Sequence, residues 1–257
     1  MSGLAYITGA SSGIGQALAR RFLDAGWRVA LVARGAAALQ AWVAQQADAA
    51  ARCSIHVADV RDIDATVAAG AACMREHGVP EVVIANAGLS VGMDTADRAD
   101  LDVMRATLET NLLGMAATFQ PFMQAMRERR SGTLVGVASV AGIRGLPGHG
   151  AYCASKAGVI AYCESLRGEC RPFGVKVVTL TPGYVDTPLT RQNPYPMPFL
   201  MQPQDFAERA YRAIVAGARY RVIPWQMGVV AALLRALPNP VFDRLLAGRP
   251  RKPRRAA

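Results

Sequence analysis

Short runs of apolar, often β-branched residues alternate with longer alanine-rich segments along most of the chain. Such runs are typical of buried strands, and we expect seven, at residues 3–8, 28–33, 54–57, 82–85, 133–138, 175–181 and 220–223. The intervening segments are long enough for helices, and they span residues 14–26, 36–50, 62–77, 100–130 and 153–171. This alternation predicts an α/β fold, a doubly wound parallel sheet of about seven strands with helices on both faces.

A proline-rich segment interrupts the alternation. Six prolines lie between residues 182 and 203, together with Met, Phe and Leu residues. Proline at this density excludes a long helix or a central strand. Exposed apolar side chains are costly unless they cover something. We therefore expect residues 184–203 to form a substrate loop, either as a lid over a cleft or packed on its own domain.

The C-terminal region departs from the pattern as well. We expect one domain over residues 1–223, and then an apolar helical extension over residues 224–248 that is too short to span a bilayer. The extension has three possible places: against the cleft or a neighbouring subunit, on an anionic membrane surface, or in the core. Residues 249–257 form a basic tail that holds five of the ten net positive charges. We expect this tail to be disordered, with contact to an anionic membrane as the alternative.

Composition narrows the class of protein. The 257 residues are 52% hydrophobic and 19% charged, as in an ordinary globular protein. The five cysteines form no CxxC pair, which favours reduced thiols and a cytoplasmic location, with a membrane-peripheral one as the alternative. We expect no secretory signal peptide and no transmembrane helix. Nucleic-acid binding is not expected, because no recognition motif accompanies the basic charge.

A glycine-rich turn follows the first predicted strand and precedes a predicted helix. Backbone N–H groups and the positive end of the helix dipole point at a phosphate in such a turn, and glycines permit the close approach of a pyrophosphate. The turn therefore predicts a dinucleotide site. Its candidate residues are Gly9, Ser11, Ser12, Gly13, Ile14 and Gly15.

Arg34 follows the second predicted strand, and no acidic residue lies between Asp24 and Asp48. NAD sites of this kind usually place an acid about 20 residues beyond the glycines, to bind the ribose hydroxyls. An arginine there suits a 2′-phosphate instead. We therefore expect NADP(H) to be preferred over NAD(H).

Tyr152 and Lys156 are separated by one helical turn, so they share a face. Ser139 precedes the tyrosine by thirteen residues. Ketone reduction needs a proton on oxygen, and a free tyrosine has a pKa near 10. A nearby ammonium group lowers that pKa, so the pair predicts proton transfer at neutral pH.

Together these features resemble the classical short-chain dehydrogenase/reductase family, whose fold is Rossmann-like. Further matches are Asp59-Val60, Asn86-Ala87-Gly88 and Pro182-Gly183-Tyr184-Val185-Asp186-Thr187. The resemblance implies that Asp59 contacts adenine, that the NAG motif closes the cofactor floor, and that Val185 and Thr187 meet the nicotinamide carboxamide. It implies a catalytic tetrad without a metal, in which Tyr152 is the acid or base, Lys156 also binds the ribose, Ser139 binds the substrate oxygen and Asn111 supports a water.

The function expected from this resemblance is NADP(H)-dependent interconversion of a ketone and a secondary alcohol. The substrate is a small molecule, and a bulky lipophilic carbonyl is one class that fits. The alternatives are a nucleotide-sugar epimerase or dehydratase and a catalytically silent NADPH-binding regulator. The family also implies a homodimer or homotetramer. We interpret His149 as a loop or cleft-wall residue and Cys153 as a packing residue.

Overall fold

The computed structural model describes residues 3–46, 49–248 and 250–254. It contains one sheet of parallel strands in the order β3-β2-β1-β4-β5-β6-β7, which confirms the predicted α/β fold. All seven predicted strands are present, with ends that differ from the expected ones by at most one residue. They are β1 (Leu4–Thr8), β2 (Arg28–Ala33), β3 (Cys53–Val57), β4 (Val82–Ala85), β5 (Thr133–Val137), β6 (Lys176–Pro182) and β7 (Tyr220–Ile223).

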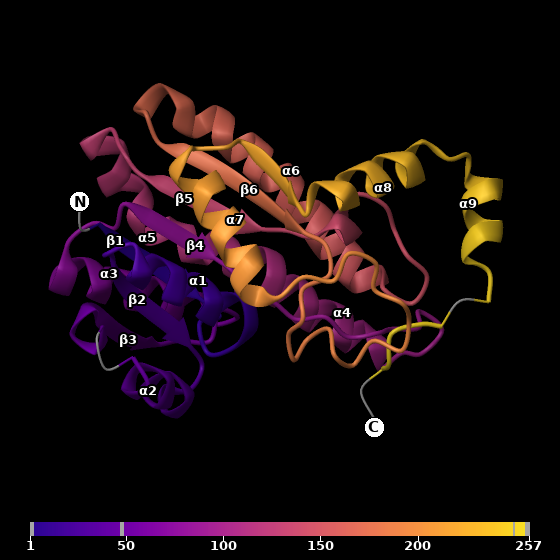
Figure 1. The fold of residues 1–257 in the computed structure, drawn as a ribbon, viewed down its shortest axis with the longest axis horizontal. Helices are drawn as coiled ribbons and strands as arrows, with labels where there is room; N and C mark the ends of the chain where they lie inside the picture. The colour runs from indigo at the N-terminus through magenta and orange to yellow at the C-terminus, as the bar shows by residue number, and fades with distance from the viewer. Residues whose placement is uncertain (1–2, 47–48, 249, 255–257) are drawn as a thin grey trace.

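Helices cover both faces of the sheet (Figure 1). The side chains of successive strand residues point to opposite faces, so each face has its own apolar core. One core contains Leu18, Phe22 and Phe206, and the other contains Phe119 and Phe122. The helices are α1 (Gly13–Asp24), α2 (Ala36–Ala44), α3 (Ile63–His77), α4 (Asp100–Leu108), α5 (Gly114–Arg129), α6 (Gly150–Cys170), α7 (Pro203–Val215), α8 (Trp225–Ala236) and α9 (Asn239–Leu246).

Three helical segments differ from the sequence predictions. The segment 100–130 contains a π-helical turn, η2 (Glu109–Leu113), between α4 and α5. The segment 36–50 is helical only to Ala44, and residues 47 and 48 lie outside the described part of the chain. Helix α7 was not predicted. Its first residue is Pro203, and proline is common at the first position of a helix because its missing N–H group would have no intrahelical partner there.

Part of the basic tail is ordered, whereas the sequence predicts disorder. Arg254 forms ion pairs with Asp97 and Asp100, the second at 2.7 Å. The Lys252 side chain is buried, and its ammonium donates a hydrogen bond to the Leu189 carbonyl at 3.2 Å. These contacts join Lys252 and Arg254 to residues distant in the sequence, which the charge pattern of the tail did not predict. Residue 249 and residues 255–257 of the predicted tail lie outside the described residues.

Candidate active site

A cavity of about 460 Å³ is lined by residues that follow β1 to β6. The carboxyl ends of parallel strands meet at one edge of a sheet, where α/β proteins bind ligands. Two predicted site residues, Gly15 and Asn111, are absent from this wall. The predicted residues that do line it are Gly9, Ser11, Ser12, Gly13, Ile14, Arg34, Asp59, Val60, Asn86, Ala87, Gly88, Ser139, Tyr152, Lys156, Pro182, Gly183, Val185 and Thr187.

The glycine turn leaves no room for side chains at three of its positions. Gly9 has a φ of +67°, and a Cβ added there would lie 2.7 Å from Cα of Ala87. A Cβ on Gly13 would lie 3.0 Å from the Thr187 side chain. At Gly15 it would lie 2.1 Å from the Gly9 carbonyl oxygen. Gly13 and Gly15 belong to the first turn of α1, so the glycine turn runs into a helix N-terminus, as a phosphate-binding turn requires.

Asn86 ties the end of β4 to the same turn. Its side-chain amide donates to the carbonyl oxygens of Thr8 and Gly9 at 3.1 and 3.3 Å. The Thr8 hydroxyl oxygen in turn accepts hydrogen bonds from the backbone N–H groups of Asn86 and Ala87. Because these bonds join neighbouring strands, the NAG segment holds the floor of the cavity against the glycine turn.

Arg34, Asp59 and Arg61 lie together on the wall beyond β2 and β3. The Arg61 guanidinium donates to both carboxylate oxygens of Asp59, at 3.1 and 2.6 Å. Hydrogen bonding by Arg61 is the main cause that lowers the pKa of Asp59, and the charge of Arg34 acts in the same direction. The sequence analysis missed Arg61. In the sequence, the only signal for Arg61 is its position two residues after Asp59. Its bond to the Asp59 carboxylate becomes visible only in the structure.

Ser139, Tyr152 and Lys156 lie on another part of the wall. The Lys156 ammonium, one turn along α6 from Tyr152, lies 5.8 Å from the centre of the tyrosine ring. It donates a hydrogen bond to the Val137 carbonyl at 2.8 Å. The Ser139 hydroxyl accepts a hydrogen bond from the Ala141 N–H at 3.2 Å. The three predicted catalytic side chains are therefore brought together by β5 and α6.

Burial controls how Tyr152 and Lys156 titrate. Desolvation raises the pKa of Tyr152, although a hydrogen bond with Ser139 acts in the opposite direction. Desolvation lowers the pKa of Lys156 to about 8. The predicted lowering of the tyrosine pKa is not found in the protein alone, because desolvation is the largest influence on this hydroxyl. The Tyr152 hydroxyl is consequently protonated at neutral pH.

Asn111 of η2 forms a hydrogen bond to α6. Its side-chain amide donates to the Ser155 hydroxyl and to the Leu89 carbonyl, both at 2.9 Å. Its carbonyl oxygen accepts from the Leu89 N–H at 2.7 Å. Asn111 is buried, so these bonds link α6 to the segment after β4. A π-helical turn is frequent at functional sites, and here it places this side chain.

The segment after β6 forms a further side of the cavity. Val185 pairs with Met201 in a parallel bridge, which closes the proline-rich segment into a loop. Leu189, Thr190 and Gln192 of this loop line the cavity, and the sequence analysis did not identify them individually. The other lining residues outside the predicted set are Val32, Ala33, Ala58, Arg61, Leu89, Ala106, Thr110, Val137, Ala138 and Pro188.

His149 and Cys153 lie close to Tyr152 in the sequence and do not line the cavity. His149 is buried in the loop before α6, where its ring nitrogens lie 3.1 Å from the Pro147 carbonyl and 3.0 Å from the Tyr195 hydroxyl. Desolvation lowers its pKa. Cys153 is a buried free thiol whose pKa is raised by burial, so it is mainly protonated at neutral pH. The contact of His149 with Tyr195 joins the proline-rich loop to the start of α6.

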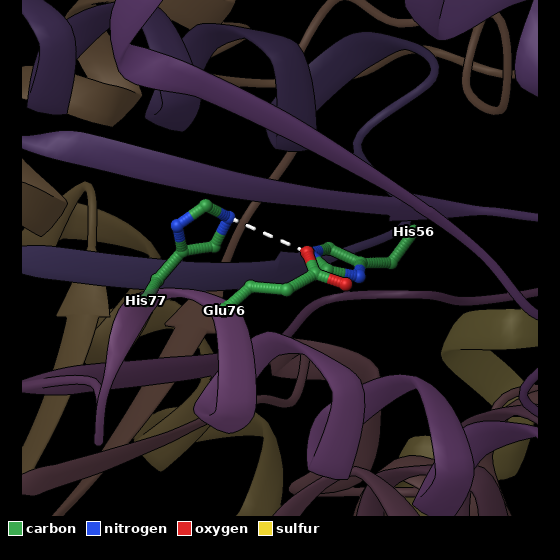
Figure 2. Close-up of side chains that lie close together, drawn as sticks. All are labelled: His56, Glu76 and His77. Carbon is green, nitrogen blue, oxygen red and sulfur yellow. Dashed lines mark ion pairs between the residues drawn. The ribbon is translucent and has the colours of Figure 1, made fainter.

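Three possible metal ligands meet elsewhere in the fold. His56 of β3 and Glu76 and His77 at the end of α3 have ligand atoms within 4.8 Å of one another (Figure 2). His77 Nε2 lies 3.6 Å from the Glu76 carboxylate. Desolvation lowers the pKa of His56, which favours the neutral imidazole that metals bind. None of the three lines the cavity, so this cluster is separate from the candidate active site.

Comparison with known proteins identifies the family. Residues 3–196 match the sequence profile of the short chain dehydrogenase family. An uncharacterized oxidoreductase from Myxococcus xanthus is 41% identical over 239 residues, which cover 93% of this chain and 94% of that protein. The chain therefore belongs to the short-chain dehydrogenase/reductase family and is an oxidoreductase.

Two further relatives are named after ketone-reducing enzymes. A putative ketoacyl reductase from Streptomyces coelicolor is 35% identical over 190 residues, covering 73% of this chain and 72% of that protein. The crystal structure of an actinorhodin polyketide ketoreductase variant with NADPH superposes with a TM-score of 0.80. It is 29% identical and covers 88% of this chain and 97% of the other.

Proposed function

We propose that this protein is an NADP(H)-dependent oxidoreductase that interconverts a ketone and a secondary alcohol. The observation that carries this proposal is one continuous cavity wall, with the glycine turn and Arg34 on one part and Ser139, Tyr152 and Lys156 on another. Gly9 and Gly13 line the cavity where α1 begins, so the backbone N–H groups of this turn suit the pyrophosphate of a dinucleotide.

In the proposed reduction, Tyr152 gives its hydroxyl proton to the carbonyl oxygen, and the bound nicotinamide supplies the hydride for the carbonyl carbon. The Tyr152 hydroxyl carries its proton at neutral pH, so it can donate that proton to a substrate oxygen. Ser139 donates a hydrogen bond to the same oxygen. Lys156 holds a positive charge beside the phenol and stabilises the phenolate that forms. Asn111 keeps α6 in position through Ser155.

The test of this mechanism is the variant Tyr152→Phe, which removes the proton and keeps the ring. We expect kcat/KM for ketone reduction to fall by about 100-fold or more, because general acid catalysis is lost. NADPH binding, measured by fluorescence titration, should change little. Turnover of Tyr152→Phe at the wild-type rate would exclude Tyr152 as the proton donor, and NADPH binding without turnover in the wild type would favour the regulatory alternative.

We propose that Arg34 makes NADP(H) the preferred cofactor. Arg34 directly follows β2 and lines the cavity, and its charge acts on the Asp59 carboxylate, which Arg61 already neutralises. Arg34→Asp should lower the NADPH/NADH ratio of kcat/KM by about tenfold or more, since a charge-assisted hydrogen bond is replaced by repulsion. Arg75→Asp makes the same charge change on exposed α3 and should leave the ratio unaltered. An unchanged ratio in Arg34→Asp would contradict the assignment.

We propose a bulky, lipophilic ketone as the substrate. Support comes from the exposed apolar side chains Leu189, Phe199 and Leu200 of the proline-rich loop, and from Leu89 and Leu189 on the cavity wall. The names of the two ketone-reducing relatives point to ketoacyl or polyketide chains. NADPH oxidation across ketones of increasing chain length should show kcat/KM rising with apolar bulk, and no dependence on bulk would contradict this substrate class.

We propose that the protein self-associates as a homodimer or homotetramer through α4, α5 and α6. A second cavity, of about 680 Å³, lies on this side of the molecule. Its lining is mainly apolar, and Leu101, Leu113 and Tyr162 on it are each at least 36% exposed. Pairing with a second copy would remove this surface from water.

A further inference from the structure

The C-terminal helices α8 and α9 extend away from the sheet as an arm (Figure 1). Met227 and Ala231 face the protein and are buried. The opposite side of α8 is apolar as well. Trp225, Val229 and Leu233 follow each other at intervals of one helical turn, and they are 67%, 49% and 64% exposed. A helix that is apolar on all sides is normally covered on all sides.

Helix α9 adds to this exposed apolar surface. Val241 and Leu245, one turn apart, are 51% and 45% exposed, whereas Phe242 is buried. We call the five exposed residues Trp225, Val229, Leu233, Val241 and Leu245 the arm surface. The single-chain protein therefore presents large apolar side chains to water over two consecutive helices, an arrangement that marks interaction sites.

The arm is held in place at its bend. The Arg144 guanidinium donates to the carbonyl oxygen of Leu237 at 2.7 Å and to the side-chain oxygen of Asn239 at 3.0 Å. It also lies 3.7 Å from the centre of the Phe242 ring. Arg144 thus joins the end of α8 to α9 from the protein side. The arm surface is preformed, because these contacts leave it exposed.

Charge on the arm favours an anionic occupant. Helices α8 and α9 contain two exposed arginines, Arg235 and Arg244, and one acidic residue, Asp243. Two further exposed arginines, Arg219 and Arg221, lie before the arm, next to and within β7. Acidic lipid headgroups would neutralise these arginines. Tryptophan is also a side chain that prefers the boundary between headgroups and hydrocarbon.

We propose that the arm surface is a peripheral membrane-binding site for bilayers that contain anionic lipids. Trp225, Val229 and Leu233 lie in the headgroup boundary, and the neighbouring arginines contact lipid phosphates. Within the described residues, no helix is long and apolar enough to cross a bilayer. The arm therefore lies on the membrane plane, and the docked tail residues Lys252 and Arg254 remain bound to the protein.

The experiment is co-sedimentation of the full-length protein with phosphatidylcholine vesicles, with and without phosphatidylglycerol. We expect binding only to the anionic vesicles, weakening as salt rises. The double variant Trp225→Ser/Leu233→Ser should bind about tenfold more weakly or worse. The matched control Val57→Ser/Val215→Ser, also exposed and apolar, should bind like the wild type. Equal thermal midpoints verify that all of the proteins are folded.

Two further measurements make the result decisive. Trp225 emission should shift to the blue on anionic vesicles, and Trp225→Phe should lose that shift because Trp27 and Trp42 lie elsewhere. Absence of binding to anionic vesicles would overturn the proposal. Sedimentation velocity without vesicles is the second measurement. If Trp225→Ser/Leu233→Ser forms a smaller assembly than the wild type, the arm surface is an interface between protein chains, and the proposal is overturned.

Discussion

At the scale of single residues, burial sets the chemistry of the candidate site. Lys156 is 4% exposed and its ammonium has one backbone acceptor, Val137. Its pKa of about 8 follows from the loss of water, since a charged group is stabilised less in the interior. The same desolvation keeps the Tyr152 hydroxyl protonated. One buried wall thus holds a proton donor beside an ammonium that titrates close to neutral pH.

Lys156 should therefore make stability depend on pH in a defined direction. The pKa of Lys156 is lower in the folded protein than in the unfolded protein, so below pH about 8 the folded protein bears the full free-energy cost of burying the ammonium. This cost disappears as pH rises towards 10.5, because the folded protein then loses the Lys156 proton before the unfolded protein does. Between these limits, wild type should gain up to about 3 kcal/mol relative to Lys156→Met. Urea unfolding of both proteins at several pH values measures this difference, and a constant difference would contradict a lowered pKa.

At the scale of elements, the glycine turn shows how local sequence and tertiary contacts combine. The turn was predicted from its spacing and its place between a strand and a helix. Its crowding comes from segments distant in sequence, since the neighbours of Gly9 and Gly13 are Ala87 and Thr187. The proline-rich loop is likewise positioned by a contact between distant residues, Tyr195 and His149. Proline density predicted a loop, but it contained no information about the partner of Tyr195.

Gly15→Ala tests the turn directly. The added Cβ would lie 2.1 Å from the Gly9 carbonyl oxygen, so the turn must move. We expect NADPH binding to weaken about tenfold or more and the free energy of unfolding to fall by about 1–3 kcal/mol. Gly35→Ala is the control, because a Cβ there meets nothing within 4 Å. Isothermal titration and thermal unfolding distinguish the two variants, and equal behaviour would show that the turn is not constrained.

At the scale of the whole molecule, two apolar surfaces lie on different elements. One is the cavity between α4, α5 and α6, and the other is the arm surface on α8 and α9. We propose another chain as the partner of the first and a lipid bilayer as the partner of the second. Because the two surfaces lie on different helices, an oligomer formed through the first would leave the arm surface exposed to a membrane.

Leu113→Glu tests self-association. Leu113 is 46% exposed on the wall of the second cavity, and a buried unpaired carboxylate at an interface is costly. We expect the variant to sediment as a smaller species than the wild type at the same concentration. Any change in its thermal midpoint should come only from the loss of the subunit contacts. Val57→Glu, on the exposed end of β3, should sediment like the wild type. A variant that keeps the wild-type mass would place the interface elsewhere.

The sequence by itself determined the strands, their parallel arrangement and the chemistry-bearing positions. Apolar runs, helical spacing and the glycine turn are local properties, and strand ends at residues such as Thr8 and Ala33 follow from them. Only the tertiary structure decided the pKa of Tyr152, the contact of Arg61 with Asp59 and the docking of Lys252. The pKa of Tyr152 depends on desolvation, and the docking of Lys252 depends on a contact between distant segments. The contact of Arg61 with Asp59 joins residues only two apart, but it depends on side-chain geometry that the sequence pattern does not contain.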